Sequence, residues 1–220
     1  PNEITAIVGH SGSGKSTIIN LLYRLDRIKS GSILIDDESI YNYTKRVYST
    51  NVSGVFQKPF MFEMSIKENL SLVDKNVTNQ VEACKRVGIH DFIKSLPKGY
   101  NTVINESSNL ISEGQKQLLV VARALLSKAE VLLFDEATSS IDPETTVLMA
   151  NILKDLKNDH TIIMVTHKPE MMDIADRVIV MEKGKVVAKG KNDEVLSKNK
   201  LYKELRSRTF ASISLNGETE

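Results

Sequence analysis

The sequence predicts an α/β fold with an all-helical subdomain inserted into it. Short apolar runs of strand length alternate with segments whose apolar residues recur at helical spacing. A glycine-rich turn joins the first strand run to the first helical segment. From Lys58 to Lys128 the pattern is mostly helical. These three observations predict a mixed, mainly parallel sheet whose sequence is interrupted by an inserted helical lobe.

The elements before and within the insertion follow from the spacing of apolar residues. A strand is expected first, then a helix, then two further strands, at Ile4–Val8, Ser16–Asp26, Ile33–Ile35 and Val52–Phe56. The inserted segment is expected to form helices at Ser65–Leu72, Thr78–Val87, Asp91–Leu96 and Ser112–Leu126.

The elements after the insertion complete the core. Val131–Phe134 and Thr161–Val165 are unbroken β-type runs, as expected for strands that are covered on both faces. Asp142 and Pro143 fit the N-cap and the first turn of a helix. Val178–Ala188 is expected to form a hairpin around Lys183-Gly184. We therefore expect an α/β core at residues 1–57 and 129–208, a helical subdomain at 58–128 and a flexible tail at 209–220.

Composition excludes several classes of function. The 220 residues include 29 Lys and Arg against 28 Asp and Glu, so the formal charge is +1 and no nucleic-acid partner is expected. One cysteine, Cys84, excludes a disulfide scaffold or a thiolate metal site and is expected to be a small buried residue. No run approaches the roughly 20 apolar residues of a membrane span, so the isolated chain is expected to be soluble.

The glycine-rich turn matches the phosphate-loop pattern G-x-x-x-x-G-K-[ST]. Its glycines allow successive backbone N–H groups to face one concavity, and the following helix directs its positive end at the same anion. Lys15 supplies a charge for the β- and γ-phosphates, and the Ser16 hydroxyl is a hard oxygen ligand suited to Mg²⁺. His10 occupies a variable position and is expected to be solvated. The expected phosphate-binding residues are Gly9, Ser11, Gly12, Ser13, Gly14, Lys15, Ser16 and Thr17.

Polar residues follow three more strand runs. Asp135 and Glu136 end the run Val131–Phe134, and a carboxylate at that edge of a parallel sheet lies beside a phosphate loop. Asp135 would hold Mg²⁺, and Glu136 would accept a proton from the attacking water or orient it. Gln57 and His167 also follow strand runs, so they could reach the same edge.

Together these motifs resemble the nucleotide-binding domain of an ATP-binding cassette (ABC) transporter. The segment Ile111-Ser112-Glu113-Gly114-Gln115 is similar to the family signature L-S-G-G-Q, which other phosphate-loop families lack. The resemblance covers Ile4 to Arg208 and implies a P-loop NTPase (RecA-like) core that binds ATP and Mg²⁺. It rests on Gly9–Thr17, on Gln57 in Phe56-Gln57-Lys58-Pro59, on the signature-like segment, on Asp135-Glu136-Ala137-Thr138-Ser139 and on His167.

The resemblance assigns roles to these residues. Glu136, His167 and Gln57 would be catalytic, and Ser16, Gln57 and Asp135 would surround the metal. Two such domains, identical or different, would sandwich two ATP molecules head to tail. In that arrangement Ser112, Gly114 and Gln115 of one domain cap the ATP held by the other, and Asp142 lies across the interface. Arg123 is expected to tie the signature helix to its own lobe.

The stretch from Val55 to Leu70 resembles the exporter branch, in which the glutamine is followed by a proline, an aromatic residue and [ST]-I-x-x-N. This predicts a domain that works at the cytoplasmic face of a membrane and contacts a transmembrane domain through its helical subdomain. Glu106 stands where exporters carry a glutamate that touches the membrane domain. The family's adenine-stacking aromatic residue lies well upstream of the phosphate loop, so the N-terminal strands are expected to be truncated and the chain to begin inside a larger protein.

Two features depart from the family pattern. Ile111 and Glu113 replace Leu and Gly of the signature, and Asn105 and Ser108 replace the glycines that flank the exporter glutamate. Glu113 costs little if it points outward.

Two alternative functions remain open. One is the separate ATPase subunit of an importer, and the other is a soluble ABC ATPase that moves no solute. The exporter-like segment after Gln57 argues against the soluble types, a repair or a translation ATPase, and Lys15 to Asp135 shows no sustained heptads of the kind that a repair ATPase needs. The importer subunit stays open. A binding module without hydrolysis is disfavoured because Glu136 and His167 are both present.

Overall fold

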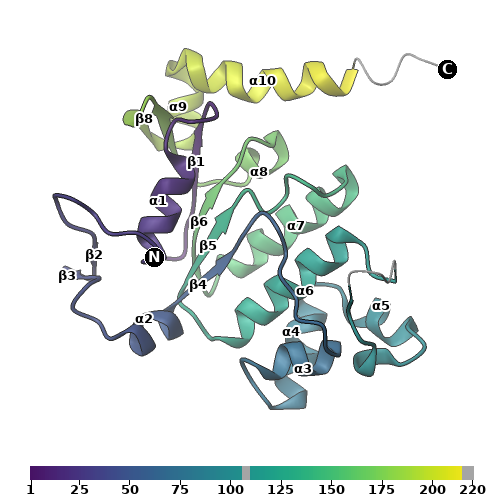
Figure 1. Cartoon of the computed structure of the whole chain (residues 1–220). Coiled ribbons are helices and arrows are strands. Elements are labelled where there is room, and N and C mark those ends of the chain that lie inside the picture. The colour runs from purple at the N-terminus through teal and green to yellow at the C-terminus, as the bar shows by residue number, and fades with distance from the viewer. Residues whose placement is uncertain (106–109, 215–220) are drawn as a thin grey trace.

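The chain folds around one six-stranded sheet with the strand order β4-β5-β6-β1-β7-β8 (Figure 1). The computed structural model describes residues 1–105 and 110–214. The pairs β4–β5, β5–β6, β6–β1 and β1–β7 are parallel, and β8 is antiparallel to β7. The strands are β1 (Ile4–Gly9), β4 (Val52–Val55), β5 (Val131–Asp135), β6 (Thr161–Val165), β7 (Arg177–Glu182) and β8 (Lys185–Lys191). The predicted mixed, mainly parallel sheet is confirmed.

Alternate residues of the central strands enter two hydrophobic cores, one on each face of the sheet. In β1, Ile7 packs with Ile19 of α1 (Lys15–Leu22), while Ala6 and Val8 face the other core. Side chains of successive strand residues point to opposite faces, so a strand that is covered on both faces reads as an unbroken apolar run. The second core is completed mainly by α6 (Glu113–Leu126), α7 (Pro143–Leu156) and the start of α10 (Lys200–Ser214).

The inserted segment is helical, as the sequence predicts. It contains α3 (Ile66–Ser71), α4 (Val77–Arg86), α5 (His90–Ser95), a short 3-10 turn at Gly99–Asn101 and α6. Cys84 lies buried in α4, and this burial raises the pKa of its thiol to about 11. Arg123 of α6 donates to the Phe60 carbonyl oxygen at 2.8 Å, so it ties the helix to its own lobe as expected.

Some elements differ from the sequence prediction. Helix α1 ends at Leu22 instead of Asp26, because Arg24 adopts a left-handed backbone conformation at φ +59°. Helix α10 continues to Ser214, into the segment expected as a tail from residue 209. The run at Ile33–Ile35 forms only a two-residue strand, β2 (Leu34–Ile35), paired with β3 (Glu38–Ser39). Three short helices were not anticipated: α2 (Lys45–Asn51), α8 (Pro169–Asp173) and α9 (Asn192–Lys198).

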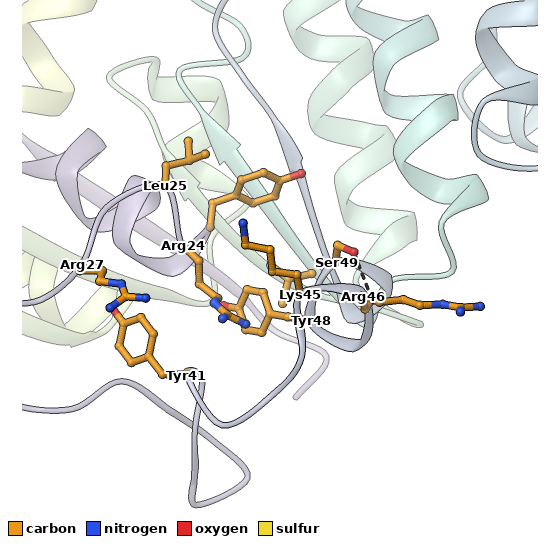
Figure 2. A pocket seen from close by; sticks show the side chains of 10 residues that line it. Arg24, Leu25, Arg27, Tyr41, Lys45, Arg46, Tyr48 and Ser49 are labelled. Atoms are coloured by element: carbon orange, nitrogen blue, oxygen red, sulfur yellow. Dashed lines mark hydrogen bonds between the residues drawn. The ribbon is translucent and has the colours of Figure 1, made fainter.

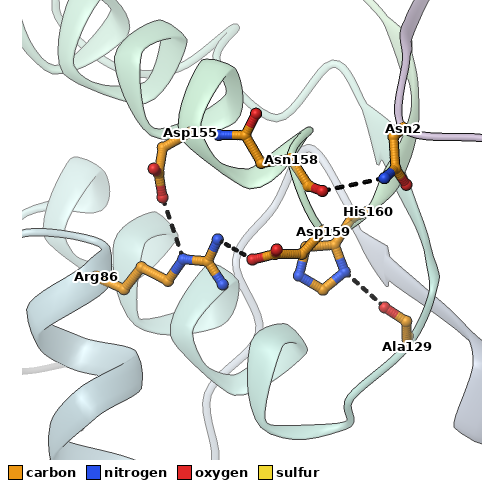
Figure 3. A network of polar contacts seen from close by, with 7 residues as sticks. All are labelled: Asn2, Arg86, Ala129, Asp155, Asn158, Asp159 and His160. Atoms are coloured by element: carbon orange, nitrogen blue, oxygen red, sulfur yellow. Dashed lines mark hydrogen bonds and ion pairs between the residues drawn. The ribbon is translucent and has the colours of Figure 1, made fainter.

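A polar network joins the helical lobe to the core (Figure 3). Arg86 of α4 donates from Nε to Asp155 at 3.2 Å and from Nη2 to Asp159 at 2.6 Å. Asp155 lies near the C-terminal end of α7, and Asp159 lies in the turn that follows it. The adjacent His160 is buried and its Nδ1 contacts the Ala129 carbonyl oxygen at 2.7 Å. The two ion pairs of Arg86 hold α4 close to the end of α7. Arg86 lies well inside the insertion, away from residues 58 and 128 at which the insertion joins the core.

We expect Arg86→Met to lower the free energy of unfolding by about 1 kcal/mol, because it removes two ion pairs that hold the lobe to the core. Urea denaturation monitored by circular dichroism measures the difference. Lys85→Met is the matched control, since among the described residues Lys85 pairs only with Glu82 in the same helix. An equal loss in both variants would show that the contact between lobes adds nothing, and the Arg86 effect should shrink at high salt.

Candidate active site

The sheet order brings four sequence motifs to one edge. β4, β5, β6 and β1 are consecutive parallel neighbours, so their carboxyl ends lie side by side. Gln57 follows β4, Asp135 and Glu136 end β5, His167 follows β6, and the phosphate loop follows β1. Residues up to 158 positions apart in the chain, from Gly9 to His167, therefore meet at a single rim of the sheet.

The loop between β1 and α1 is shaped around Lys15. The buried Lys15 ammonium donates to the Gly9 and His10 carbonyl oxygens at 2.9 and 3.0 Å. Its burial lowers the pKa of the ammonium, and the charges of Glu136 and Asp135 oppose this shift. Gly12 and Gly14 have φ of +75° and +96°, in the left-handed region that glycine tolerates best.

The loop residues differ in their exposure. Ser11, Gly12, Ser16 and Thr17 are exposed, whereas Gly9, Ser13 and Lys15 are buried. His10 is exposed, as predicted. The Ser13 hydroxyl is buried and has no hydrogen-bond partner within the described residues. A phosphate oxygen is the kind of acceptor that would satisfy it.

The hairpin of β7 and β8 closes one side of the loop, a contact that the sequence analysis did not anticipate. Gly184 donates its N–H to the Ser13 carbonyl oxygen at 3.1 Å. A Cβ atom at Gly9 would lie 2.3 Å from the Met181 carbonyl oxygen. Only the pairing of β1 with β7 reveals this approach, and no motif in the hairpin marks it.

Ser16 and Asp135 meet beside the loop. The Ser16 hydroxyl donates to Asp135 Oδ1 at 3.0 Å. Burial raises the pKa of the Asp135 carboxyl, while the hydrogen bond from Ser16 opposes this rise. A hydroxyl and a carboxylate are hard oxygen donors, so the pair fits a cation such as Mg²⁺.

Glu136 and His167 lie across from each other at the ends of β5 and β6. His167 Nδ1 is 3.7 Å from Glu136 Oε1, and the His167 side chain is the more exposed of the two. The Glu136 backbone is held by donation of its N–H to the Val165 carbonyl oxygen at 3.0 Å. Its φ is +48°, a strained conformation for a non-glycine residue that is typical of functional sites.

The signature-like segment begins α6. Ser112 is the N-cap: its hydroxyl accepts from Gln115 N–H at 3.2 Å, and Gln115 Oε1 accepts from Ser112 N–H at 2.8 Å. Glu113 points outward and pairs with Lys116 at 2.8 Å, which meets the condition for a small cost. Within its own chain this segment thus forms a capping box at the N-terminus of a 14-residue helix.

Gly114 and Asp142 connect this segment to α7. A Cβ atom at Gly114 would lie 3.0 Å from the Thr145 side chain, so the two helices approach closely there. Asp142 is the N-cap of α7, as predicted, and accepts from Thr145 N–H at 2.8 Å.

Two further site residues are less informative. Gln57 is exposed just beyond β4. Glu106 lies outside the described residues.

Among the helices of the described part, none is long and apolar enough to span a bilayer.

The comparison with family models decides the identity. The model described as ABC transporter matches residues 1–139, more than half of the chain. The chain belongs to the ABC transporter family. This ABC domain therefore binds ATP, and the resemblance of its motifs is confirmed.

Its relatives are transporter proteins. It is 39% identical to a putative ABC transporter ATP-binding protein of Mycoplasma pneumoniae over 93% of this chain and 32% of that one. It is 36% identical to a probable multidrug resistance ATP-binding/permease protein of Bacillus subtilis, over 92% of this chain and 30% of that one. It is also 35% identical to an ATP-dependent lipid A-core flippase of Acinetobacter baylyi, over 96% of this chain and 37% of that one.

A solved structure agrees with these relatives. A bacterial Atm1-family ABC exporter with ATP bound superposes with a TM-score of 0.87 at 31% identity, over 94% of this chain and 37% of that one. These likenesses confirm the exporter-type resemblance. The ABC domain spans about a third of the length of these three relatives.

We expect Gly9→Ala to destabilise the ABC domain by roughly 2 kcal/mol or more, because the new methyl group meets a backbone carbonyl that cannot move alone. Gly12→Ala is the control in the same loop, since a Cβ there has nothing within 4 Å and carries only the conformational cost of about 1 kcal/mol. Thermal unfolding of both variants tests this. A smaller loss for Gly9→Ala than for Gly12→Ala would contradict the close approach.

Proposed function

We propose that this ABC domain hydrolyses ATP and uses the cycle of binding and hydrolysis to drive an exporter. One observation carries the proposal: the consecutive order β4-β5-β6-β1 lines up Gln57, the Asp135–Glu136 pair, His167 and the phosphate loop at a single edge. Phosphoryl transfer depends mainly on positioning and electrostatic stabilisation, and such an edge supplies both.

Different residues of the site would bind the phosphates and the metal ion. Lys15 and the N–H groups of the loop bind the phosphates, with Gly9, Ser11, Gly12, Ser13, Gly14, Ser16 and Thr17 forming the cradle. Ser16, Asp135 and Gln57 would hold Mg²⁺, which when bound would neutralise charge on the phosphate oxygens.

Hydrolysis needs a base for the attacking water. Glu136 orients this water and accepts its proton while the water oxygen bonds to the γ-phosphorus and the bond to the ADP oxygen breaks. His167, 3.7 Å from Glu136, contacts the γ-phosphate and the same water. The strained backbone of Glu136 supports this role, since it fixes the carboxylate at the strand end.

A second nucleotide-binding domain completes the site. The exposed Ser112, with Gly114 and Gln115, begins a long helix whose N–H groups favour an anion. These residues would cap the ATP of the facing domain, and Asp142 would lie across that interface. The binding of ATP would then close the pair of domains, and hydrolysis would release it.

The membrane partner would contact the helical lobe. Phe60 and Phe62 are 62% and 43% exposed and pack edge to face, with ring centroids 4.8 Å apart. Buried Asn69 holds their loop by accepting from Phe62 N–H at 2.9 Å. The relative from Bacillus subtilis is named as an ATP-binding/permease protein, which supports a transmembrane domain in the same assembly at the cytoplasmic face of a membrane.

We expect Lys15→Ala to lower the affinity for ATP by a factor of about 100 or more, because a buried charge that faces the phosphates is lost. Isothermal titration calorimetry with ATP measures this. His10→Ala should stay within about threefold of wild type, because His10 contributes its backbone carbonyl to the loop and exposes its side chain. Unchanged binding in Lys15→Ala would remove the phosphate loop from the site.

We expect Glu136→Gln to reduce the turnover of ATP by a factor of about 100 or more while the affinity for ATP changes little, because an amide cannot accept the proton. Phosphate release and nucleotide binding are measured separately. Glu130→Gln is the control, because this exposed residue adjoins the opposite end of β5. Full turnover in Glu136→Gln would exclude Glu136 as the base.

A further inference from the structure

A cavity of about 720 Å³ lies between the end of α1 and α2 (Figure 2). None of its lining residues belongs to the candidate active site. It reaches Val52, the first residue of β4, whereas Gln57 follows the last. The cavity is therefore at the opposite end of that strand, and its size lies within the range of small-molecule sites.

Positive charge dominates this cavity. Arg24, Arg27, Lys45 and Arg46 line it, and no carboxylate does. Within the described chain, none of these four residues forms an ion pair with a carboxylate. Four cations gathered without a counterion repel one another, so an anion that enters the cavity relieves this repulsion.

Arg24 is held in place before any ligand arrives. Its guanidinium lies 5.0 Å from the ring centroid of Tyr48 and 5.8 Å from that of Tyr41. Its Nη1 donates to the Tyr43 carbonyl oxygen at 2.9 Å, and Tyr48 in turn donates to the Leu22 carbonyl oxygen. A guanidinium has five N–H donors, so most remain for a ligand, and little side-chain entropy is lost on binding.

The side chains of the four cationic residues point in different directions. In Figure 2 the Arg24 guanidinium lies near the rings of Tyr41 and Tyr48, and the Lys45 ammonium points from α2 toward the side on which Leu25 lies. The Arg46 side chain extends away from the other labelled residues. Arg46 therefore adds charge to the rim of the cavity, while Arg24 and Lys45 can contact its contents.

We propose that this cavity binds a phosphate-bearing anion, a phosphomonoester or a diphosphate, with Arg24 as the fixed anchor. A planar guanidinium matches two oxygens of a phosphate, and the nearby charges of Lys45 and Arg27 favour an anion of charge −2 over a carboxylate. The source of the phosphate is either a soluble small molecule or the headgroup of a lipid. This site does not depend on the proposed hydrolysis of ATP.

The test is calorimetric titration of the chain with inorganic pyrophosphate in a Lys15→Ala background, in which the phosphate loop no longer competes. Saturable binding is expected there. Adding Arg24→Gln or Lys45→Gln should lower the association constant about tenfold, while adding Arg46→Gln should change it less than about threefold, although each removes one charge. Lys45 is exposed, so its variant keeps the test valid if Arg24→Gln unfolds the chain.

Vesicles distinguish the two sources. Co-sedimentation of the Lys15→Ala chain with phosphatidylcholine vesicles that contain phosphatidic acid is compared with phosphatidylcholine alone. Recruitment that Lys45→Gln abolishes and Arg46→Gln preserves indicates a lipid headgroup, whereas pyrophosphate binding without recruitment indicates a soluble ligand. Absence of pyrophosphate binding in the Lys15→Ala chain, or equal losses in the Lys45 and Arg46 variants, overturns the proposal.

Discussion

The parallel pairing of β1 with β6 and of β6 with β5 determines where the chemistry takes place. Ile7 pairs with Val165, and Val165 pairs with Asp135. The carboxyl ends of β1, β6 and β5 therefore lie level with one another along the strand direction. This register brings Asp135 within hydrogen-bond distance of Ser16 at the start of α1. A shift of one residue in either pair would turn the side chains of that strand to the opposite face. The site therefore depends on the hydrophobic pattern that sets the register of these strands.

Helix α6 extends this constraint to the helical lobe. Its first turn carries the signature-like residues, and its body contacts the segment that follows β4 at two points. Gln117 donates to the Phe56 carbonyl oxygen at 3.2 Å, and Arg123 donates to the Phe60 carbonyl oxygen. Gln57 lies between these two anchors. If the proposed facing domain displaces α6, these two hydrogen bonds would transmit the displacement to the segment that carries Gln57.

The sequence predicted the strands and helices whose apolar residues recur at a regular spacing, and it predicted the residues at the ends of these elements. The phosphate loop, the caps Ser112 and Asp142, and the order of the main strands and of the longer helices follow from local patterns. Contacts between distant segments leave no such pattern. The approach of Gly9 to Met181 depends on β1 pairing with β7, and the link from Arg86 to Asp159 depends on how α4 meets α7. Helix α2 has only two apolar residues, the adjacent Val47 and Tyr48, so its sequence shows no helical period and the cationic cavity beside it was not predicted either.

Burial opposes the ionisation of the charged residues at the strand ends, and nearby charges and hydrogen bonds favour it. Burial alone disfavours the ionised form of both Lys15 and Asp135, since it lowers the pKa of the amine and raises that of the acid. Each is supported by the charge of the other and by fixed dipoles, namely the Gly9 and His10 carbonyl oxygens and the Ser16 hydroxyl. These dipoles are set by the backbone before a nucleotide arrives, so little reorganisation is needed when phosphate charge enters the loop. The same principle applies to Arg24, whose guanidinium is held between tyrosine rings and a carbonyl oxygen. In both places the fold fixes a buried or half-buried cation in position, so an anion that binds there meets a cation that loses little side-chain freedom.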